Sequence, residues 1–316
     1  MILAADRGLH VTGLTRVFTT RDGTVRKAVD DVDLTVRPGE LVSVLGPNGA
    51  GKTTTVRMLT GLLLPTSGTV LLDGHDVVKD RKKASLACGF SLGGDTGLYP
   101  RLTARQNLTF FGLMYGLRGG ALEGKADQLL RTVNLADRAG DPVGSFSRGM
   151  KQRLHLARAL LHDPAVLILD EPSAGLDPQS AAAMRALVAE LSAEGRSILL
   201  TTHDMREAEE LSDRIVLMRD GRIHAESTAS ALRLAAAERL GHTVRIDFAE
   251  AEVPDGVGDC PGLLDEQRTG STAILRATDG PAAVQWLLAR FPGRTLSVAV
   301  TPPTLEEVFL EMVAVS

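Results

Sequence analysis

The run Gly46-Pro47-Asn48-Gly49-Ala50-Gly51-Lys52-Thr53-Thr54 constrains this chain most, because it fills every fixed position of a phosphate-binding loop. An apolar strand pattern at Leu41–Leu45 precedes it and a helix-forming segment follows it, which is the context that such a loop requires. The glycines let backbone N–H groups approach phosphate oxygens, Lys52 supplies a cation, and the Thr53 hydroxyl can ligate Mg²⁺. We therefore expect an α/β nucleotide-binding fold built around this loop.

Two later strand patterns end in acidic or imidazole side chains. The apolar run 166–169 is followed by Asp170 and Glu171, and Ser197–Thr202 is followed by His203. Because ligands bind at the carboxyl ends of parallel strands, we expect these three side chains near the phosphate loop. Asp170 can hold Mg²⁺ through water, Glu171 can orient or deprotonate an attacking water, and His203 can contact the terminal phosphate. The chain therefore carries the residues of a nucleotide-hydrolysing centre.

Two other residues have an ordinary structural interpretation. The ring of Phe18 can stack on a nucleotide base, but taken alone this residue fits a core aromatic better. Ser147 occupies an N-cap position before a helix on which Met150 and Leu154 share a face, and this pattern alone describes an ordinary capped helix.

The sequence predicts a large domain at 1–226 and a small one at 227–316. Apolar residues at helical spacing over 103–134 predict a helical insertion in the first domain, so that a helical subdomain spans about 93–160. The second domain begins with an Ala- and Leu-rich helical linker and continues as a small α/β domain. Its expected elements are strands at 244–248, Thr272–Ala277 and 296–300, a helix at 282–290, and a last helix capped by Thr304 and Glu307. The apolar stripe of that last helix fits core packing better than a partner surface.

Composition limits the class of protein. The net charge of −4 and the pI near 6.0 argue against a nucleic-acid partner, and the short basic cluster at 79–83 fits a solvated loop. Cys88 and Cys260 give neither a disulfide framework nor a metal-ligand spacing, which fits a reducing compartment. The sequence has no apolar run of about 18 to 20 residues and no signal-peptide pattern, so we expect a cytoplasmic chain.

With these motifs assembled, about residues 8–226 resemble the ATP-binding subunit of an ABC transporter. The resemblance rests on the order of the phosphate loop, the signature segment, the Asp-Glu strand end, the Ser-Ala-Gly-Leu-Asp loop and the histidine. It implies ATP and Mg²⁺ as cofactors, with Thr53 and Asp170 supporting the metal. It also implies that Glu171 is the hydrolytic carboxylate and that His203 senses the γ-phosphate. The sequence of residues 98–105 resembles that of export-type subunits for drugs and sodium.

The same resemblance implies two copies and a membrane partner. Ser147 and Gly149 would contact the γ-phosphate held by the opposite copy, and Asp177 would link the two halves. Each motif occurs once, so two chains are needed to complete the sites, and the permease would be a separate polypeptide. The homodimer would then lie on the cytoplasmic face of the membrane and drive export of a drug, sodium or another substrate.

The chain departs from that family in two places. The signature usually reads Leu-Ser-Gly-Gly-Gln, whereas residues 146–150 read Phe-Ser-Arg-Gly-Met, with Ser147 and Gly149 retained. The glutamine that meets Mg²⁺ and relays to the membrane subunit is replaced by Gly93 or Gly94, depending on the alignment, and neither can ligate a metal through a side chain. Our hypothesis is that Asp95, or a backbone carbonyl with water, compensates.

Two other classes stay open as alternatives. A soluble ABC-type ATPase that acts on ribosomes or DNA usually carries two cassettes, a long coiled-coil insert or a basic surface, and none is visible in this sequence. A P-loop kinase would have no role for the signature segment. A GTPase would carry an Asn-Lys-x-Asp motif, and no asparagine here is followed by lysine.

Overall fold

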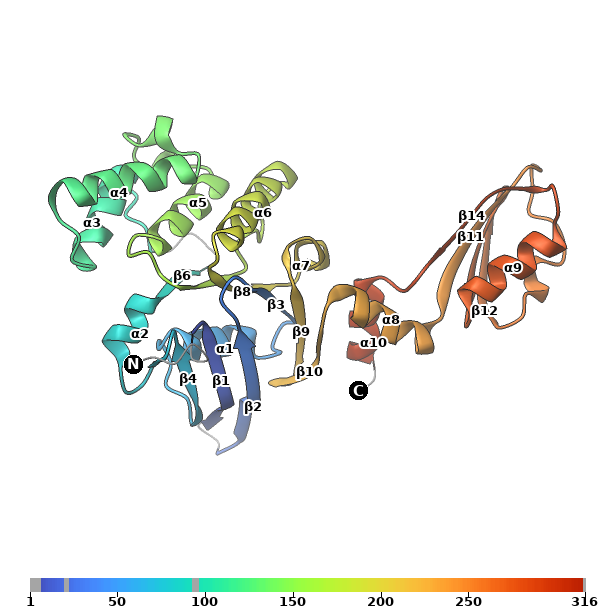
Figure 1. Cartoon of the computed structure of the whole chain (residues 1–316), viewed down its shortest axis with the longest axis horizontal. Helices are drawn as coiled ribbons and strands as arrows, with labels where there is room; N and C mark the ends of the chain where they lie inside the picture. Colours follow the sequence, from blue (N-terminus) through green and yellow to red (C-terminus); the bar gives the residue numbers. More distant parts are fainter. Residues whose placement is uncertain (1–6, 20–22, 93–96, 315–316) are drawn as a thin grey trace. The chain divides into compact units, whose positions relative to one another are not determined.

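The computed structural model describes residues 7–19, 23–92 and 97–314 (Figure 1). The chain divides into two compact units, Met1–Glu226 and Ser227–Ser316, and each has its own hydrophobic core. The predictions for Gly93, Gly94 and Asp95 lie outside the described residues and stay predictions.

The first unit is organised around a six-stranded sheet with the order β10-β9-β3-β8-β7-β6. Its strands are β3 (Leu41–Leu45), β6 (Cys88–Leu92), β7 (Val166–Asp170), β8 (Ser197–Thr202), β9 (Arg214–Arg219) and β10 (Arg222–Ser227). The pairs β6–β7, β7–β8, β3–β8 and β3–β9 are parallel, so the carboxyl ends of these five strands lie at one edge. Strands β3 and β7 are buried along their whole length, which explains their continuous apolar runs. The phosphate loop follows β3, and Glu171 follows β7, at that edge.

A second sheet packs onto the first through a shared core. Its antiparallel strands are β1 (Leu9–Thr19), β2 (Val25–Val36), β4 (Ser67–Leu72) and β5 (His75–Asp76), in the order β2-β1-β4-β5. In β2, Val32, Leu34 and Val36 are buried and the residues between them are more exposed, as their alternation predicts. Helix α1 (Lys52–Leu59) contributes Val56 and Met58 to the same core, so the phosphate loop is held between the two sheets and this helix.

Helices α3 (Ala104–Met114), α4 (Gly119–Thr132) and α5 (Arg148–Ala159) form a helical layer of this unit (Figure 1). Leu108, Leu130 and Leu154 are fully buried among these helices, which confirms the helical insertion predicted over 103–134. Two 3₁₀ turns, Ala136–Arg138 and Val143–Ser145, lie between α4 and α5. Further helices of the unit are α2 (Arg81–Ala87), α6 (Pro178–Ala193) and α7 (Met205–Leu211).

The basic cluster at 79–83 leads into a helix, so the prediction of a loop is wrong for residues 81–83. Asp80 stands at the N-cap position of α2, and Arg81, Lys82 and Lys83 form its exposed first turn. Only Ala84 of this seven-residue helix is buried, so the sequence carries no periodic apolar signal there. The predicted exposure of the cluster to solvent is confirmed.

The second unit contains an antiparallel sheet with the order β12-β13-β11-β14. Its elements are α8 (Ala229–Leu240), β11 (His242–Phe248), the 3₁₀ turn Val257–Asp259, β12 (Leu263–Thr269), β13 (Thr272–Ala277), α9 (Gly280–Arg290), β14 (Thr295–Thr301) and α10 (Leu305–Ala314). Residues of α9 share a core with the sheet, in which the rings of Phe248 and Phe291 meet edge to face with 5.4 Å between their centroids. Strand β12 was not predicted, because this edge strand is exposed on both faces and has no apolar alternation.

The last helix begins as predicted. The Glu307 carboxylate accepts a hydrogen bond from the Thr304 N–H (2.8 Å), and the Thr304 hydroxyl accepts one from the Glu307 N–H (3.2 Å), which confirms the capping box. Leu305 and Val308 of the apolar stripe are buried, so the stripe packs into the unit as expected.

Candidate functional site

A cavity of about 380 Å³ lies at the phosphate loop. Its lining comes from β1, β2, the loop before α1, the first turn of α1 and the residue after β7. The members are Phe18, Arg26, Ala28, Pro47, Asn48, Gly49, Ala50, Gly51, Lys52, Thr53, Thr54 and Glu171. This volume falls within the range of roughly 300 to 1,000 Å³ that small-molecule sites occupy. The fold therefore brings most of the predicted nucleotide-binding residues to one cavity.

Two positions of the loop require glycine because other backbone lies directly against them. Gly51 is the N-cap of α1 with a φ of 105°, and a Cβ there would lie 2.5 Å from the Ala28 carbonyl oxygen. A Cβ on Gly46 would lie 2.3 Å from the Met218 carbonyl oxygen. The loop backbone can therefore pack directly against the backbone of β2 and β9. The N-terminus of α1, which follows the loop, lies in the cavity wall.

Lys52 is a buried cation beside two acids. Its Nζ atom donates to the carbonyl oxygens of Gly46 (2.6 Å) and Pro47 (3.2 Å). Burial lowers the pKa of Lys52, and the nearby carboxylates of Glu171 and Asp170 oppose this change. The ammonium group is thus held inside the loop, where phosphates would compete for it as acceptors.

Asp170 ends β7 as a buried carboxyl. Burial raises the pKa of Asp170, whereas the Thr201 hydroxyl, which donates to Oδ1 at 2.5 Å, lowers it. Thr53 lies exposed in the cavity wall. A hydroxyl and a carboxylate are hard oxygen donors, and Mg²⁺ needs only one or two protein ligands when phosphates and waters complete its shell. These residues therefore fit the ion.

Glu171 and His203 meet at the edge of the sheet. The Glu171 Oε2 atom lies 3.4 Å from His203 Nδ1, and the side chains are 33% and 63% exposed. The Glu171 φ of 49° is uncommon for a residue with a side chain, and its N–H donates to the Thr201 carbonyl at 2.9 Å. This turn places the carboxylate in the lining of both the phosphate-loop cavity and a second cavity of about 330 Å³, which His203 also lines.

Phe18 lies in the cavity wall rather than in the core. Its side chain is 39% exposed, and the guanidinium carbon of Arg16 lies 4.6 Å from the ring centroid. The interpretation as a core aromatic is therefore wrong.

Several predicted residues are not among those described as lining the phosphate-loop cavity, and three of them lie at α5 and α6. Ser147 is the N-cap of α5, where its hydroxyl accepts from the Met150 N–H at 3.3 Å. Asp177 is the N-cap of α6 and accepts from the Ser180 N–H at 3.0 Å, and hydrogen bonds from Ser180 lower the pKa of Asp177. Gly149 is buried, and a Cβ on it would lie 2.9 Å from the Ser180 Oγ atom. All three therefore lie close to the junction of α5 and α6.

Sequence reasoning missed three residues of the site. Arg26 and Ala28 line the cavity from β2, but no motif marks them, because they meet the loop only across the fold. Thr201 bonds to Asp170 across neighbouring parallel strands. Its signal was a hydroxyl near the end of an otherwise apolar strand pattern.

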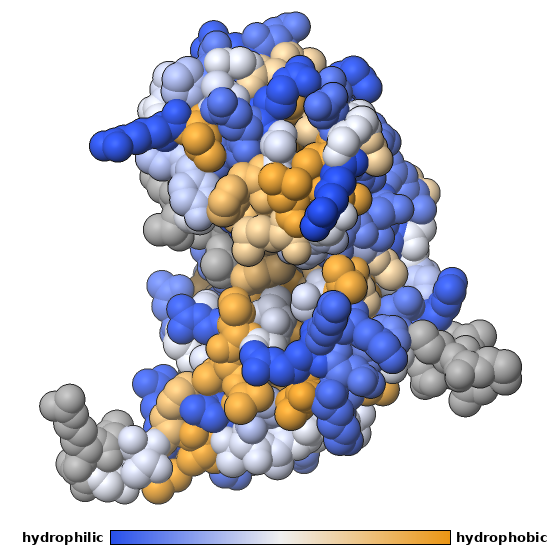
Figure 2. All heavy atoms as spheres, turned by 90° about the vertical axis from the view of Figure 1, so that its left-hand side faces the viewer, coloured by the Kyte–Doolittle hydropathy of each residue, from blue (hydrophilic) through white to orange (hydrophobic). Residues whose placement is uncertain are grey.

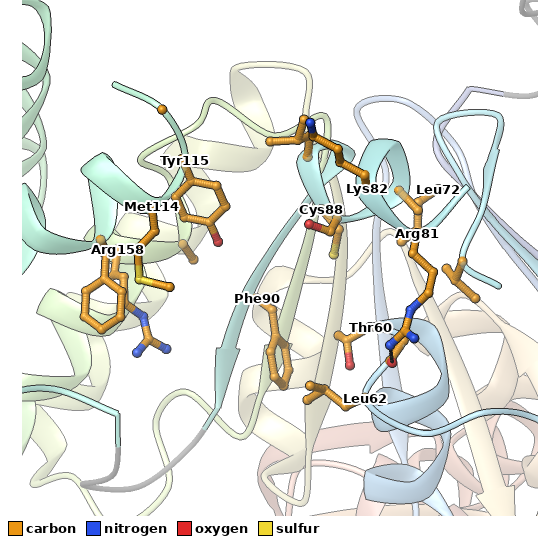
Figure 3. Close-up of a pocket in the computed structure, with 18 residues that line it drawn as sticks. Thr60, Leu62, Leu72, Arg81, Lys82, Cys88, Phe90, Met114, Tyr115 and Arg158 are labelled. Carbon is orange, nitrogen blue, oxygen red and sulfur yellow. Dashed lines mark hydrogen bonds between the residues drawn. The ribbon is translucent and has the colours of Figure 1, made fainter. Parts of the chain in front are cut away.

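A groove of about 850 Å³ lies elsewhere in the first unit, between α2 and β6 on one side and α3 and α5 on the other (Figure 3). Figure 2 shows apolar surface on both sides of a hollow on this face of the molecule. Leu62 and Met114 line the groove with 64% and 71% of their side chains exposed. Its charged lining residues, as far as the structure describes them, are the cations Arg81, Lys82 and Arg158.

Within residues 7–19, 23–92 and 97–314, none of the helices combines the length and the apolar character that crossing a bilayer requires.

The known proteins that this chain resembles are ATP-binding subunits of ABC transporters. A profile of the ABC transporter family matches residues 29–174. The chain is 38% identical to the daunorubicin resistance ATP-binding protein DrrA3 of Streptomyces coeruleorubidus, over 98% of this chain and 96% of that protein. It is 40% identical to the ABC transporter ATP-binding protein NatA of Bacillus subtilis, over 68% of this chain and 87% of that protein. It is 38% identical to the Nod factor export ATP-binding protein I of Burkholderia lata, over 90% and 91%.

Two solved structures share the fold. The dimeric post-hydrolysis state of the ATP-binding cassette MJ0796, bound to ADP and Pi, has a TM-score of 0.63 and 26% identity, over 70% of this chain and 98% of that one. CbiO1 from Clostridium perfringens, part of the ABC transporter complex cbiONQ, has a TM-score of 0.63 and 28% identity, over 73% and 95%.

Proposed function

Because the chain belongs to the ATP-binding subunits of ABC transporters, we propose that two copies of it close over two ATP molecules and drive export through a separate membrane permease. The observation that carries the proposal is the meeting of the phosphate loop, Glu171 and His203 at one edge of the sheet. Relatives named for daunorubicin resistance and for Nod factor export support an export substrate, with a drug first among the candidates.

The phosphate loop binds the nucleotide. Backbone N–H groups at the start of α1 and the Lys52 ammonium hold the phosphates, and Phe18, which also lines the cavity, stacks on the base. Thr53 and Asp170 would hold Mg²⁺, which when bound neutralises charge on the phosphate oxygens. The Thr201 hydroxyl keeps Asp170 oriented by its hydrogen bond to Oδ1.

Glu171 acts on the attacking water. Its carboxylate accepts a proton from the water, whose oxygen then attacks the γ-phosphate in line with the leaving oxygen. His203, 3.4 Å from the same carboxylate, contacts the γ-phosphate and keeps the Glu171 side chain in place. Catalysis comes mainly from this positioning, because small displacements of reacting groups cost much of the rate.

The second copy completes the site. Ser147 and Asp177 cap helices at the surface, away from the phosphate-loop cavity of their own chain. Their exposure supports a role of Ser147 at the γ-phosphate of the opposite copy and of Asp177 at the contact between the copies. Gly149 would contact the same phosphate as Ser147, two residues away in the signature segment. The dimeric cassette to which the chain is similar supports the same arrangement.

We further propose that the permease binds in the groove between α2 and α3. An exposed apolar surface of this kind marks an interaction site in a soluble chain. The cations Arg81, Lys82 and Arg158 on its walls favour a permease segment with an apolar face and acidic side chains, since complementary charge fixes the orientation of a partner. The chain would then lie on the cytoplasmic face of the membrane.

The hydrolytic role is tested with Glu171→Gln beside Glu190→Gln, a control on the exposed face of α6. We expect the wild type and the control to hydrolyse Mg²⁺-ATP. We expect Glu171→Gln to lose turnover but to form an ATP-stabilised dimer in size-exclusion chromatography. Normal turnover by a monomeric Glu171→Gln variant would refute both the assigned base and the dimer.

The groove is tested with Met114→Asp beside Leu296→Asp, an equally exposed leucine in the second unit (71% and 73%). The assay is cosedimentation of the purified variants with membrane vesicles from the cells that make the chain. Met114→Asp should lose membrane binding while it keeps ATP hydrolysis, and Leu296→Asp should keep both. Equal binding by the two variants would rule the groove out as the permease site.

A further inference from the structure

One buried acid of the first unit has no part in the mechanism above. Glu207 lies on α7 with none of its surface exposed. Within the part of the chain that the structure describes, neither of its carboxyl oxygens has a hydrogen-bond partner of normal geometry. A buried, poorly satisfied carboxyl is costly, so its presence in a core calls for a reason.

Glu207 lies between the two segments that carry the hydrolytic pair. Ser173 follows Glu171 by two residues, and Thr202 directly precedes His203. Burial raises the pKa of Glu207, and the nearby hydroxyls of Ser173 and Thr202 oppose this rise. The carboxylate of Asp204 adds to the rise and the cation of Arg185 opposes it. The neutral form is therefore favoured relative to an exposed glutamate.

A carboxyl group here can serve both segments, because each of its two oxygens can accept a hydrogen bond from a hydroxyl. The Thr202 Oγ1 atom already accepts from the Asp204 N–H at 3.0 Å, so its own proton is available for a carboxyl oxygen of Glu207. The Ser173 hydroxyl can donate to the other carboxyl oxygen, in keeping with its lowering of the Glu207 pKa. The Glu207 backbone is also held here, since its N–H donates to the Asp204 carboxylate at 3.4 Å.

We infer that Glu207 is a positioning residue: its carboxyl group ties the Ser173 loop to the end of β8 and so sets the separation of Glu171 and His203. The inference rests on the proposed function, because it assigns Glu207 a role only through that pair. The distance between Glu171 and His203 depends on how their segments are held together, because the two residues lie on separate segments and their side chains meet at 3.4 Å.

The test compares Glu207→Gln, Glu207→Met and Glu209→Met in the full chain. Glutamine keeps one acceptor and one donor in the same shape, whereas methionine fills the same volume and keeps neither. Glu209→Met is the control, because Glu209 is exposed on the same helix. Each variant is measured for kcat and KM of ATP hydrolysis, melting temperature and binding of a fluorescent ATP analogue.

We expect Glu207→Gln and Glu209→Met to stay within about threefold of the wild-type kcat. Glu207→Met should bind the ATP analogue normally with an unchanged KM, but its kcat should fall on the order of 10- to 100-fold, the scale of a small misplacement of reacting groups. Ser173→Ala, which removes the hydroxyl that donates to Glu207, should also lower kcat at constant KM.

Wild-type hydrolysis tests the proposed function, and the ratio between variants tests the inference. A folded Glu207→Met variant with wild-type kcat would show that the acid only fills space. A Glu207→Gln variant as impaired as the Met variant would show that hydrogen bonding at this position does not hold the pair, and it would overturn the inference. Full activity of Ser173→Ala would also overturn the inference, whether or not Glu207→Met folds.

Discussion

Ser147 holds two roles that substitution can separate, one in the fold and one between copies. Its hydroxyl caps α5 by accepting from the Met150 N–H at 3.3 Å, a long hydrogen bond. Replacing an N-cap serine by alanine costs about 0.5 to 2 kcal/mol, and the long bond favours the lower half of that range. For a unit of this size, 1 kcal/mol shifts the melting temperature by about 2 to 4 °C. Ser147→Ala should therefore melt about 1 to 5 °C below the wild type.

Ser147→Asp should behave differently. Aspartate caps a helix as well as serine does, and a carboxylate is favourable at a helix N-terminus, so this variant should melt at or above the wild-type temperature. If residue 147 contacts the γ-phosphate of the opposite copy, the new charge repels it. Two unit charges 4 Å apart cost about 4 kcal/mol at an effective dielectric constant of 20, which corresponds to up to roughly a thousandfold loss of hydrolysis.

Melting of the first unit by circular dichroism and ATP hydrolysis by the full chain give the two readouts. A stable Ser147→Asp variant that hydrolyses ATP at the wild-type rate would remove Ser147 from the γ-phosphate. An Asp variant that melts as low as Ser147→Ala would instead contradict the capping role.

Three further predictions follow from single positions. Gly51→Ala should abolish binding of a fluorescent ATP analogue, because the φ of Gly51 is 105° and the new Cβ would lie 2.5 Å from the Ala28 carbonyl oxygen. The control Gly120→Ala, in open space on α4, should bind the analogue normally. Hydrogen bonds from neighbouring hydroxyls and an arginine hold the pKa of Asp247 at about 2, below its ordinary value of 3.8. The Asp247 carboxylate therefore stabilises the second unit fully above pH 3.8, and this contribution is lost as the pH falls toward 2. The melting temperature of Asp247→Asn should lack this part of the acid dependence, and an unchanged pH profile would contradict the assignment. Burial raises the pKa of the Cys88 thiol to about 12, so a thiol reagent at neutral pH should label it only after unfolding, and fast labelling of the native chain would count against its burial.

Local patterns determined much of this protein. The phosphate loop, its flanking strand and helix, and the capping box of Thr304 and Glu307 each depend on residues close together in the chain. Continuous apolar runs identified the buried strands β3 and β7, because a parallel strand covered on both faces has no polar side. The short helix α2 and the edge strand β12 were not predicted, because neither has a periodic or continuous apolar pattern.

Tertiary structure decided which of these residues meet. The strand order sets β7 beside β8, and only this order brings Glu171 to His203 and Thr201 to Asp170. The position of Phe18 in the cavity wall also depends on contacts between segments far apart in sequence, as does the burial of Glu207. Sequence periodicity reports whether a residue faces inward, but the neighbour that it faces is set by packing between elements, which no local pattern encodes.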